Sequence, residues 1–112
     1  MQMHVTYDSL KNESNVAKHG VDLSSASFLD WSEVMACVDT RRDYREVREI
    51  GYGIIDERLF CVVFTQRDDT MHIISLRKAN QREVRNYVEQ TENRHANAGR
   101  RRSNQPRNRG GS

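Results

Sequence analysis

The sequence predicts an α+β domain in which helices pack on a small antiparallel sheet. The chain of 112 residues has the length of a single domain. Hydrophobic residues make up 36% of it and charged residues 30%, which is polar but still allows one small core. Segments with strand and helix patterns follow in the order strand, helix, helix, strand, strand, strand, helix, and this order is typical of the α+β class.

The N-terminal segments are predicted from capping signals. Residues 4–7 form a short opening strand. Asp8 or Ser9 can cap a helix that runs to about Lys18, and Gly20 supplies the left-handed residue that commonly ends a helix. The apolar stripe of this helix is poor, so we expect it to lie on the surface of a larger body.

A second short helix and two strands follow. Asp22 or Ser24 can cap the helix. Residues 35–40 form a plausible strand, and residues 45–55 a longer one. Alternation along the longer strand places one set of side chains on a common face: Arg48, Ile50, Tyr52 and Ile54. Gly51 and Gly53 lie on the other face, where another element can approach closely.

The central strand is the most apolar segment of the chain. Residues 59–66 are almost continuously apolar, so this strand should be covered on both faces. Asp56-Glu57 forms the tight turn before it. Asp68-Asp69 forms the turn after it, into a strand over residues 71–77. Two adjacent carboxylates such as Asp68-Asp69 could also bind a metal, but acidic residues at such a position more often simply form a turn.

A capping box begins the last helix. Asn80 and Glu83 have the spacing at which each side chain binds the other residue's backbone amide. The apolar spacing ends near Asn93. Residues 1–93 are therefore interpreted as the folded domain, and residues 94–112, rich in Arg, Asn, Gly and Ser, as a disordered tail.

The net charge of +2 conceals an asymmetry along the chain. Residues 1–93 hold 12 Lys and Arg against 16 Asp and Glu, whereas residues 94–112 hold six Arg and no acid. A mildly acidic domain does not indicate a general nucleic-acid binder. Contact with RNA must therefore come from a local cluster of cations or from the tail.

Cysteine usage and hydropathy favour an ordinary cytoplasmic protein. Cys37 and Cys61 lie in apolar segments without the spacing of a metal site, so reduced, buried thiols are favoured over a disulfide. No apolar run approaches the length of a membrane span, and the N-terminus lacks the pattern of a signal peptide. We expect a cytoplasmic location and no membrane contact.

Five segments together resemble the BrnT toxin family over about residues 4–90. No single segment is decisive, but the first and the last are some fifty residues apart and keep the family order. The segments are Tyr7-Asp8 with Lys11, Asn15 and Lys18-His19-Gly20-Val21; Ala26 to Asp30; Arg48 with Ile50-Gly51; Arg58 with Val62 to Arg67; and Ile73 to Ala79 with Glu83 and Tyr87.

The resemblance implies both a fold and an activity. It implies a RelE-like fold and an endoribonuclease that arrests translation by cleaving RNA. It also implies a partner, a BrnA-like antitoxin of the ribbon-helix-helix class that neutralises the toxin in a hetero-oligomer and represses the operon. Many members have proline where this chain has Ser9 and Trp31, and glycine where it has Glu57; the basic tail has no counterpart.

Metal-free RNA cleavage needs a proton acceptor for the 2′-hydroxyl and cations for the phosphate, so no cofactor or metal is expected. His19 is the candidate for proton transfer, although a histidine at a helix end also binds the last carbonyls. Arg67 and Arg77 end neighbouring strands and suit two-point phosphate contact. The hairpin between these strands does not bring the two ends together, and solvated arginines paired with acids are the alternative.

Further basic residues complete the predicted site. Lys18 and Arg48 join the catalytic group, with a salt bridge across the sheet as the alternative for Arg48. Lys11 shares a helix face with Lys18 and is a candidate for RNA binding, unless that face is simply solvated. Arg58 and Lys78 lie in the matching segments and are further candidates for RNA binding. The alternatives for the whole chain are a non-enzymatic protein-binding module and an RNA-binding domain that works through the tail.

Overall fold

The computed structural model describes residues 4–41 and 45–100, with side chains as far as Arg94. Contacts divide the chain into two compact units, residues 1–79 and residues 80–112, and each is described by itself. The first unit holds the sheet and the N-terminal helices. The second unit begins with the long C-terminal helix.

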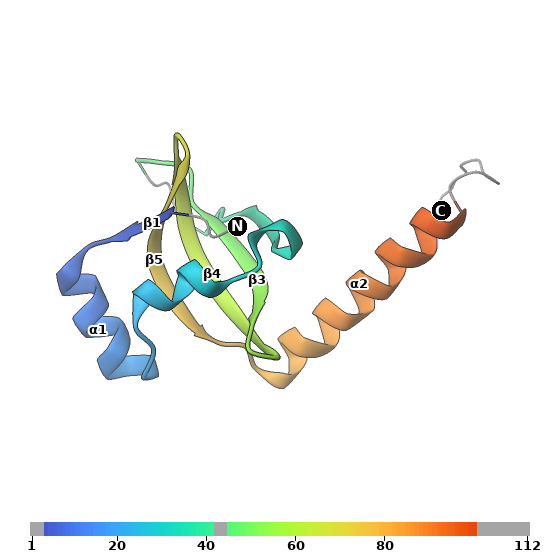
Figure 1. Ribbon diagram of the computed structural model, residues 1–112, viewed down its shortest axis with the longest axis horizontal. Coiled ribbons are helices and arrows are strands. Elements are labelled where there is room, and N and C mark those ends of the chain that lie inside the picture. The colour runs from blue at the N-terminus through green and yellow to red at the C-terminus, as the bar shows by residue number, and fades with distance from the viewer. Residues whose placement is uncertain (1–3, 42–44, 101–112) are drawn as a thin grey trace. The chain divides into compact units, whose positions relative to one another are not determined.

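The first unit contains a five-stranded mixed sheet in the order β1-β5-β4-β3-β2 (Figure 1). The strands are β1 (His4–Tyr7), β2 (Met35–Val38), β3 (Glu49–Ile55), β4 (Arg58–Arg67) and β5 (Thr70–Lys78). The α+β class is confirmed. The expectation of a purely antiparallel sheet is wrong, because the chain leaves β1 through helices, so β1 can join the outer edge of β5 in parallel.

The N-terminal helices begin and end where local signals place them. Helix α1 (Ser9–His19) is capped by the Asp8 carboxylate, which accepts from the amides of Leu10 and Lys11, and Gly20 ends it with a φ of 69°. The expected second helix consists of two 3₁₀ segments. These are η1 (Leu23–Phe28), capped by Asp22, and η2 (Trp31–Glu33).

Strand β3 is shorter than the sequence indicates. It begins at Glu49, so Arg48 lies just before the strand and not inside it. The segment that leads into β3 is held by hydrogen bonds outside the regular strand pairing. The Asp39 amide donates to the Arg48 carbonyl at 2.7 Å, and the Thr65 hydroxyl donates to the Val47 carbonyl at 3.1 Å.

The hydrophobic core lies on one face of the sheet, beneath the segment from Val21 to Trp31. Trp31 meets Phe64 edge to face, with ring centroids 5.1 Å apart. The expected close approach at Gly51 and Gly53 is confirmed: a Cβ at either position would lie 2.8 Å from Val34. The buried core residues are Val21, Leu23, Ala26, Leu29, Phe60, Val62, Phe64, Met71, Ile73 and Leu76.

A β-bulge in β5 changes which side chains face this core. Phe64 pairs with Ile73, whereas Val63 pairs with Ser75, so Ile74 has no partner on β4. Before the bulge the odd-numbered side chains of β5 enter the core, and after it Leu76 does so. The opposite face of the sheet, here called the second face, carries Arg67 and Thr65 of β4 and His72, Ser75 and Arg77 of β5.

The two cysteines differ in environment. Both are free thiols. Cys61 is buried, as expected for the central strand β4. Cys37 is exposed, so its predicted burial is wrong, because β2 is the edge strand of the sheet.

The side chain of Asn15 joins α1 to the edge of β5. It is only 5% exposed. Its amide donates to the carbonyls of Val21 and Leu76 at 2.9 and 2.8 Å, and its oxygen accepts from the Leu76 amide at 3.2 Å. Because β1 pairs with β5 only as far as Ile73, Asn15 supplies the partner that a longer β1 would have supplied.

The second unit begins with α2 (Gln81–Arg100). The predicted capping box is confirmed: the Asn80 oxygen accepts from the Glu83 amide at 2.8 Å, and Glu83 accepts from the Asn80 amide at 2.9 Å. The helix continues seven residues beyond Asn93, and the rest of the predicted tail, residues 101–112, lies outside the described residues. No helix in the described part of the chain is both long and apolar enough to span a bilayer.

Replacing Asn15 with Ala should lower the free energy of unfolding by about 2–4 kcal/mol, because the buried Leu76 amide and two carbonyls lose their partner. Urea denaturation measures the change. Ser14→Ala, on an exposed neighbour in the same helix, should stay within about 0.5 kcal/mol of the wild type. An Asn15→Ala protein as stable as the Ser14→Ala control would show that the three bonds contribute nothing.

The turn between β3 and β4 offers a stabilising substitution. Asp56 and Glu57 both have positive φ, of 48° and 66°, in a two-residue hairpin loop. Glu57→Gly should raise the free energy of unfolding by about 1 kcal/mol, because glycine adopts this conformation without the clash of a Cβ. Glu57→Ala removes the same charge but keeps the Cβ. Equal melting temperatures for the two variants would show that the strain is absent.

Candidate active site

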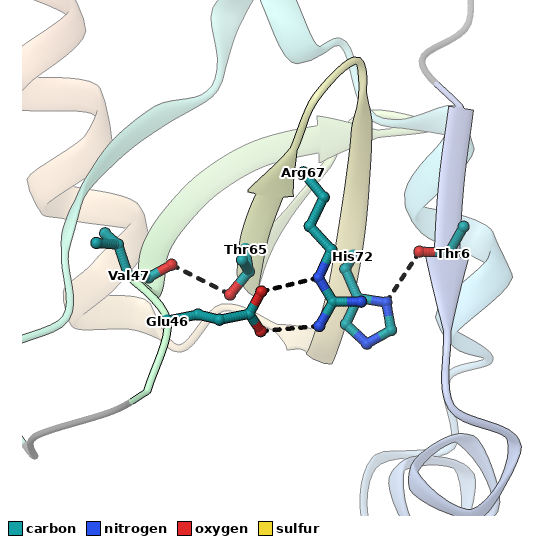
Figure 2. A network of polar contacts seen from close by, with 6 residues as sticks. All are labelled: Thr6, Glu46, Val47, Thr65, Arg67 and His72. Atoms are coloured by element: carbon teal, nitrogen blue, oxygen red, sulfur yellow. Dashed lines mark hydrogen bonds and ion pairs between the residues drawn. The ribbon is translucent and has the colours of Figure 1, made fainter.

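A cluster of polar side chains lies on the second face, at the end of the sheet where the β4–β5 hairpin turns (Figure 2). Thr65 pairs with His72, and Arg67 pairs with Thr70, across the two strands. Arg67 and His72 therefore occupy diagonal positions on one face, where long side chains come within reach of each other. The parallel pairing of β1 with β5 adds Thr6 directly beside His72.

His72 is held by a hydrogen bond to Thr6. The Thr6 hydroxyl lies 2.9 Å from Nδ1 of the imidazole. Partial burial lowers the pKa of His72, and the positive charge of Arg67 lowers it further. The neutral imidazole is thereby favoured at neutral pH. In this form one ring nitrogen is a donor and the other an acceptor.

Arg67 forms a two-point ion pair with Glu46, a residue of the segment that leads into β3. Its Nη2 and Nε donate to the two carboxylate oxygens at 2.8 and 3.0 Å. This hydrogen bonding lowers the pKa of Glu46, so the carboxylate stays charged. The bond from Thr65 to the Val47 carbonyl fixes the same segment against β4 (Figure 2).

Further charges surround the cluster. Asp8 and Lys11, at the start of α1, both affect the pKa of His72, Asp8 raising it and Lys11 lowering it. Arg48 acts on Glu46 and lowers its pKa. Positive charges from three separate segments, Lys11, Arg48 and Arg67, therefore act on the titratable groups of this cluster.

The structure divides the sequence-predicted site residues between the two ends of the sheet. Arg48 and Arg67, with Lys11, lie at the hairpin end. Arg77 pairs with Cys61, six residues along β4 from Arg67, which corresponds to about 20 Å. The structure therefore does not bring Arg67 and Arg77 together.

The remaining candidates lie at the opposite end. Arg58 begins β4, and Lys78 pairs with Phe60 on the face that holds the core, although its own side chain is exposed. His19 and Lys18 end α1, about one turn beyond Asn15 and its bonds to Leu76. The His19 side chain is exposed, and the described residues offer it neither a hydrogen bond nor an ion pair.

His72 is the functional candidate that the sequence analysis missed. It stands between Met71 and Ile73 in an apolar strand. His72 and Arg77 are five positions apart, and residues an odd number of positions apart on a regular strand lie on opposite faces. Regular alternation from Arg77 therefore places His72 on the core face. Only the bulge at Ile74 brings both to the second face. The sequence does carry a sign of the bulge: the buried apolar positions shift from an odd number at Ile73 to an even number at Leu76.

No metal site accompanies the cluster in the residues described. Nowhere in residues 4–41 and 45–94 do three or more His, Cys, Asp or Glu side chains come together in a way that could hold a metal ion. The polar groups of the cluster itself are an imidazole, a carboxylate, a guanidinium and two hydroxyls. This set can transfer a proton and contact an anion.

The fold and the cluster together define a small α+β protein with a histidine and basic side chains on one sheet face. Residues 7–83 match the family model described as the ribonuclease toxin BrnT of a type II toxin–antitoxin system. The match spans well over half of the chain, and the chain belongs to this family. A search of curated proteins finds no match to it.

Proposed function

We propose that the chain is a metal-independent endoribonuclease whose centre is His72 with Arg67. The observation that supports this is their shared position on the second face, beside a hydroxyl that orients the imidazole. In the proposed reaction the 2′-oxygen of the RNA attacks the neighbouring phosphorus, and the bond to the 5′-oxygen breaks. The products are a 2′,3′-cyclic phosphate and a 5′-hydroxyl.

His72 is the proposed proton acceptor. If Nδ1–H donates to Thr6, Nε2 keeps its lone pair and can take the proton of the 2′-hydroxyl. The lowered pKa supports this role, because the imidazole must be neutral before it accepts a proton. The leaving 5′-oxygen takes its proton from solvent.

Arg67 is the proposed phosphate ligand. Its planar guanidinium already makes a two-point contact with the Glu46 carboxylate, and a phosphate offers the same geometry. Binding of RNA would therefore displace Glu46. Arg48 and Lys11 add positive charge near the same phosphate, which stabilises the charge that builds on it during the reaction.

A second arrangement uses the opposite end of the sheet. There His19 and Lys18 would act with Arg77, and Arg58 would bind RNA. The exposure of His19 gives this arrangement less support, since among the described residues no hydrogen-bond partner fixes its imidazole. The binding-module alternatives, through the domain or through the basic tail, predict no cleavage at all.

The cellular role follows from the family. We propose that RNA cleavage arrests translation in the cytoplasm. We further propose that a BrnA-like antitoxin of the ribbon-helix-helix class neutralises this chain in a hetero-oligomer and represses the operon. The family name supports the existence of an antitoxin, because a type II toxin is paired with a protein partner.

Substituting the two histidines separately tests the assignment. His72→Ala should lower kcat/KM for RNA by about 10²–10⁴-fold, because the proton acceptor is lost, and His19→Ala should leave it within about threefold. Cleavage is measured on a labelled RNA, with detection of the 2′,3′-cyclic phosphate. Circular dichroism shows that both variants fold. The reverse ranking of the two variants would contradict the proposal.

The pH profile tests the protonation state of His72. A proton acceptor works only when neutral, so kcat/KM should fall as the pH drops through the pKa of His72 in the free enzyme. Because that pKa is lowered, the acid limb should lie below the ordinary value for histidine. The measurement is kcat/KM against pH for the wild type. A limb above that value would contradict the role.

Co-expression tests the proposed partner. The gene beside this one should encode a small ribbon-helix-helix protein. Its co-expression should restore growth to cells that make the toxin, and the two proteins should copurify. Expression of His72→Ala without the partner serves as the control and should permit growth. Copurification without any protection of growth would contradict neutralisation.

A further inference from the structure

Arg77 lies on the same face as the proposed centre but far along the sheet. The bulge at Ile74 places His72 and Arg77 on one face, although five residues separate them. The Arg77 guanidinium donates to the Lys78 carbonyl at 3.3 Å, which keeps it at the end of β5. Its side chain remains partly exposed.

The distance between the two ends fits a strand of RNA and not a single phosphate. Arg77 pairs with Cys61 of β4, and Cys61 lies six residues from Arg67 along that strand. This separation corresponds to about 20 Å along the backbone. At the roughly 3.4 Å rise of stacked nucleotides, this span corresponds to about six nucleotides, and to fewer in an extended strand. A dinucleotide cannot bridge it.

Half-buried side chains connect the two ends on the second face. Val63 pairs with Ser75 on β5 and with Ile50 on β3, and Tyr52 pairs with Cys61, the β4 partner of Arg77. Apolar and aromatic surfaces of this kind can contact unpaired bases, whereas basic residues contact the phosphates. The second face therefore has an arginine at each end, Arg67 and Arg77, and apolar side chains between them.

We infer that Arg77 forms a distal phosphate subsite, and that the substrate is a single strand of several nucleotides lying along the second face from Arg67 to Arg77. This inference rests on the proposed function, since it takes His72 and Arg67 as the centre. It assigns Arg77 to substrate binding and not to the reacting phosphate.

Binding to oligonucleotides of two lengths tests the subsite. The probes are a dinucleotide and an octamer of 2′-O-methyl RNA, which cannot be cleaved because the nucleophile is blocked. Fluorescence anisotropy on the full chain gives Kd for the wild type, Arg77→Ala and Arg67→Ala. Arg85→Ala is the matched comparison, since it removes the same charge from an exposed arginine of α2 that has no proposed role in RNA binding.

Arg77→Ala should raise the octamer Kd by about fivefold to tenfold and leave the dinucleotide Kd unchanged, because only the octamer reaches from Arg67 to Arg77. Arg67→Ala should raise the Kd of both oligonucleotides. Arg85→Ala should show no such dependence on length. The salt dependence of octamer binding should also fall by about one phosphate contact in Arg77→Ala.

Two results would overturn the inference. An equal loss for both lengths in Arg77→Ala would place Arg77 at the same phosphate as Arg67, and no loss at either length would remove it from the RNA path. A different result would refute the catalytic proposal alone. If the wild type binds with the expected dependence on length but never cleaves unmodified RNA, the subsite stands and the nuclease assignment falls.

Discussion

The hydrogen bonds of Asn15 to the edge of β5 are the interaction on which the position of the N-terminal elements depends. Strand β1 covers only the first part of that edge, and the Asn15 amide completes it at Leu76. The same side chain binds the Val21 carbonyl, where the chain turns from α1 into the core. One buried side chain thereby fixes α1 against the sheet at its C-terminal half.

This attachment also determines the surroundings of His72. With the end of α1 fixed at Leu76 and its start fixed by the Asp8 cap, Asp8 and Lys11 come near the imidazole. Strand β1, which precedes the helix, brings Thr6 to Nδ1. The first and the last of the five segments that resemble the family, around Asn15 and around Leu76, are therefore joined directly in the fold.

The features that the sequence predicted correctly are local. The Asp8 cap, the left-handed Gly20 and the Asn80–Glu83 capping box each involve residues within a few positions of one another, so their chemistry is visible in the sequence. The close approach at Gly51 was also foreseen, because a missing side chain within a strand leaves room for a neighbour.

The features that the sequence analysis missed are nonlocal. The parallel pairing of β1 with β5 joins residues 66 positions apart, and no local pattern specifies it. The bulge at Ile74 reverses the alternation of β5, so regular alternation from Arg77 places His72 on the wrong face. Arg48 was placed inside a strand because alternation continues through it, although its carbonyl binds Asp39 outside the regular pairing of β3.

The charge distribution explains how an acidic domain can still recognise a phosphodiester. Residues 1–93 carry more acids than bases, so no long-range positive field attracts RNA to the domain. Recognition by the domain itself must then come from short-range geometry. The two-point contact of Arg67 with Glu46 shows that the guanidinium is already oriented for a planar pair of anionic oxygens. Under the proposed function, Glu46 competes with phosphate for Arg67, so a ligand must contact other points of the second face in order to replace it.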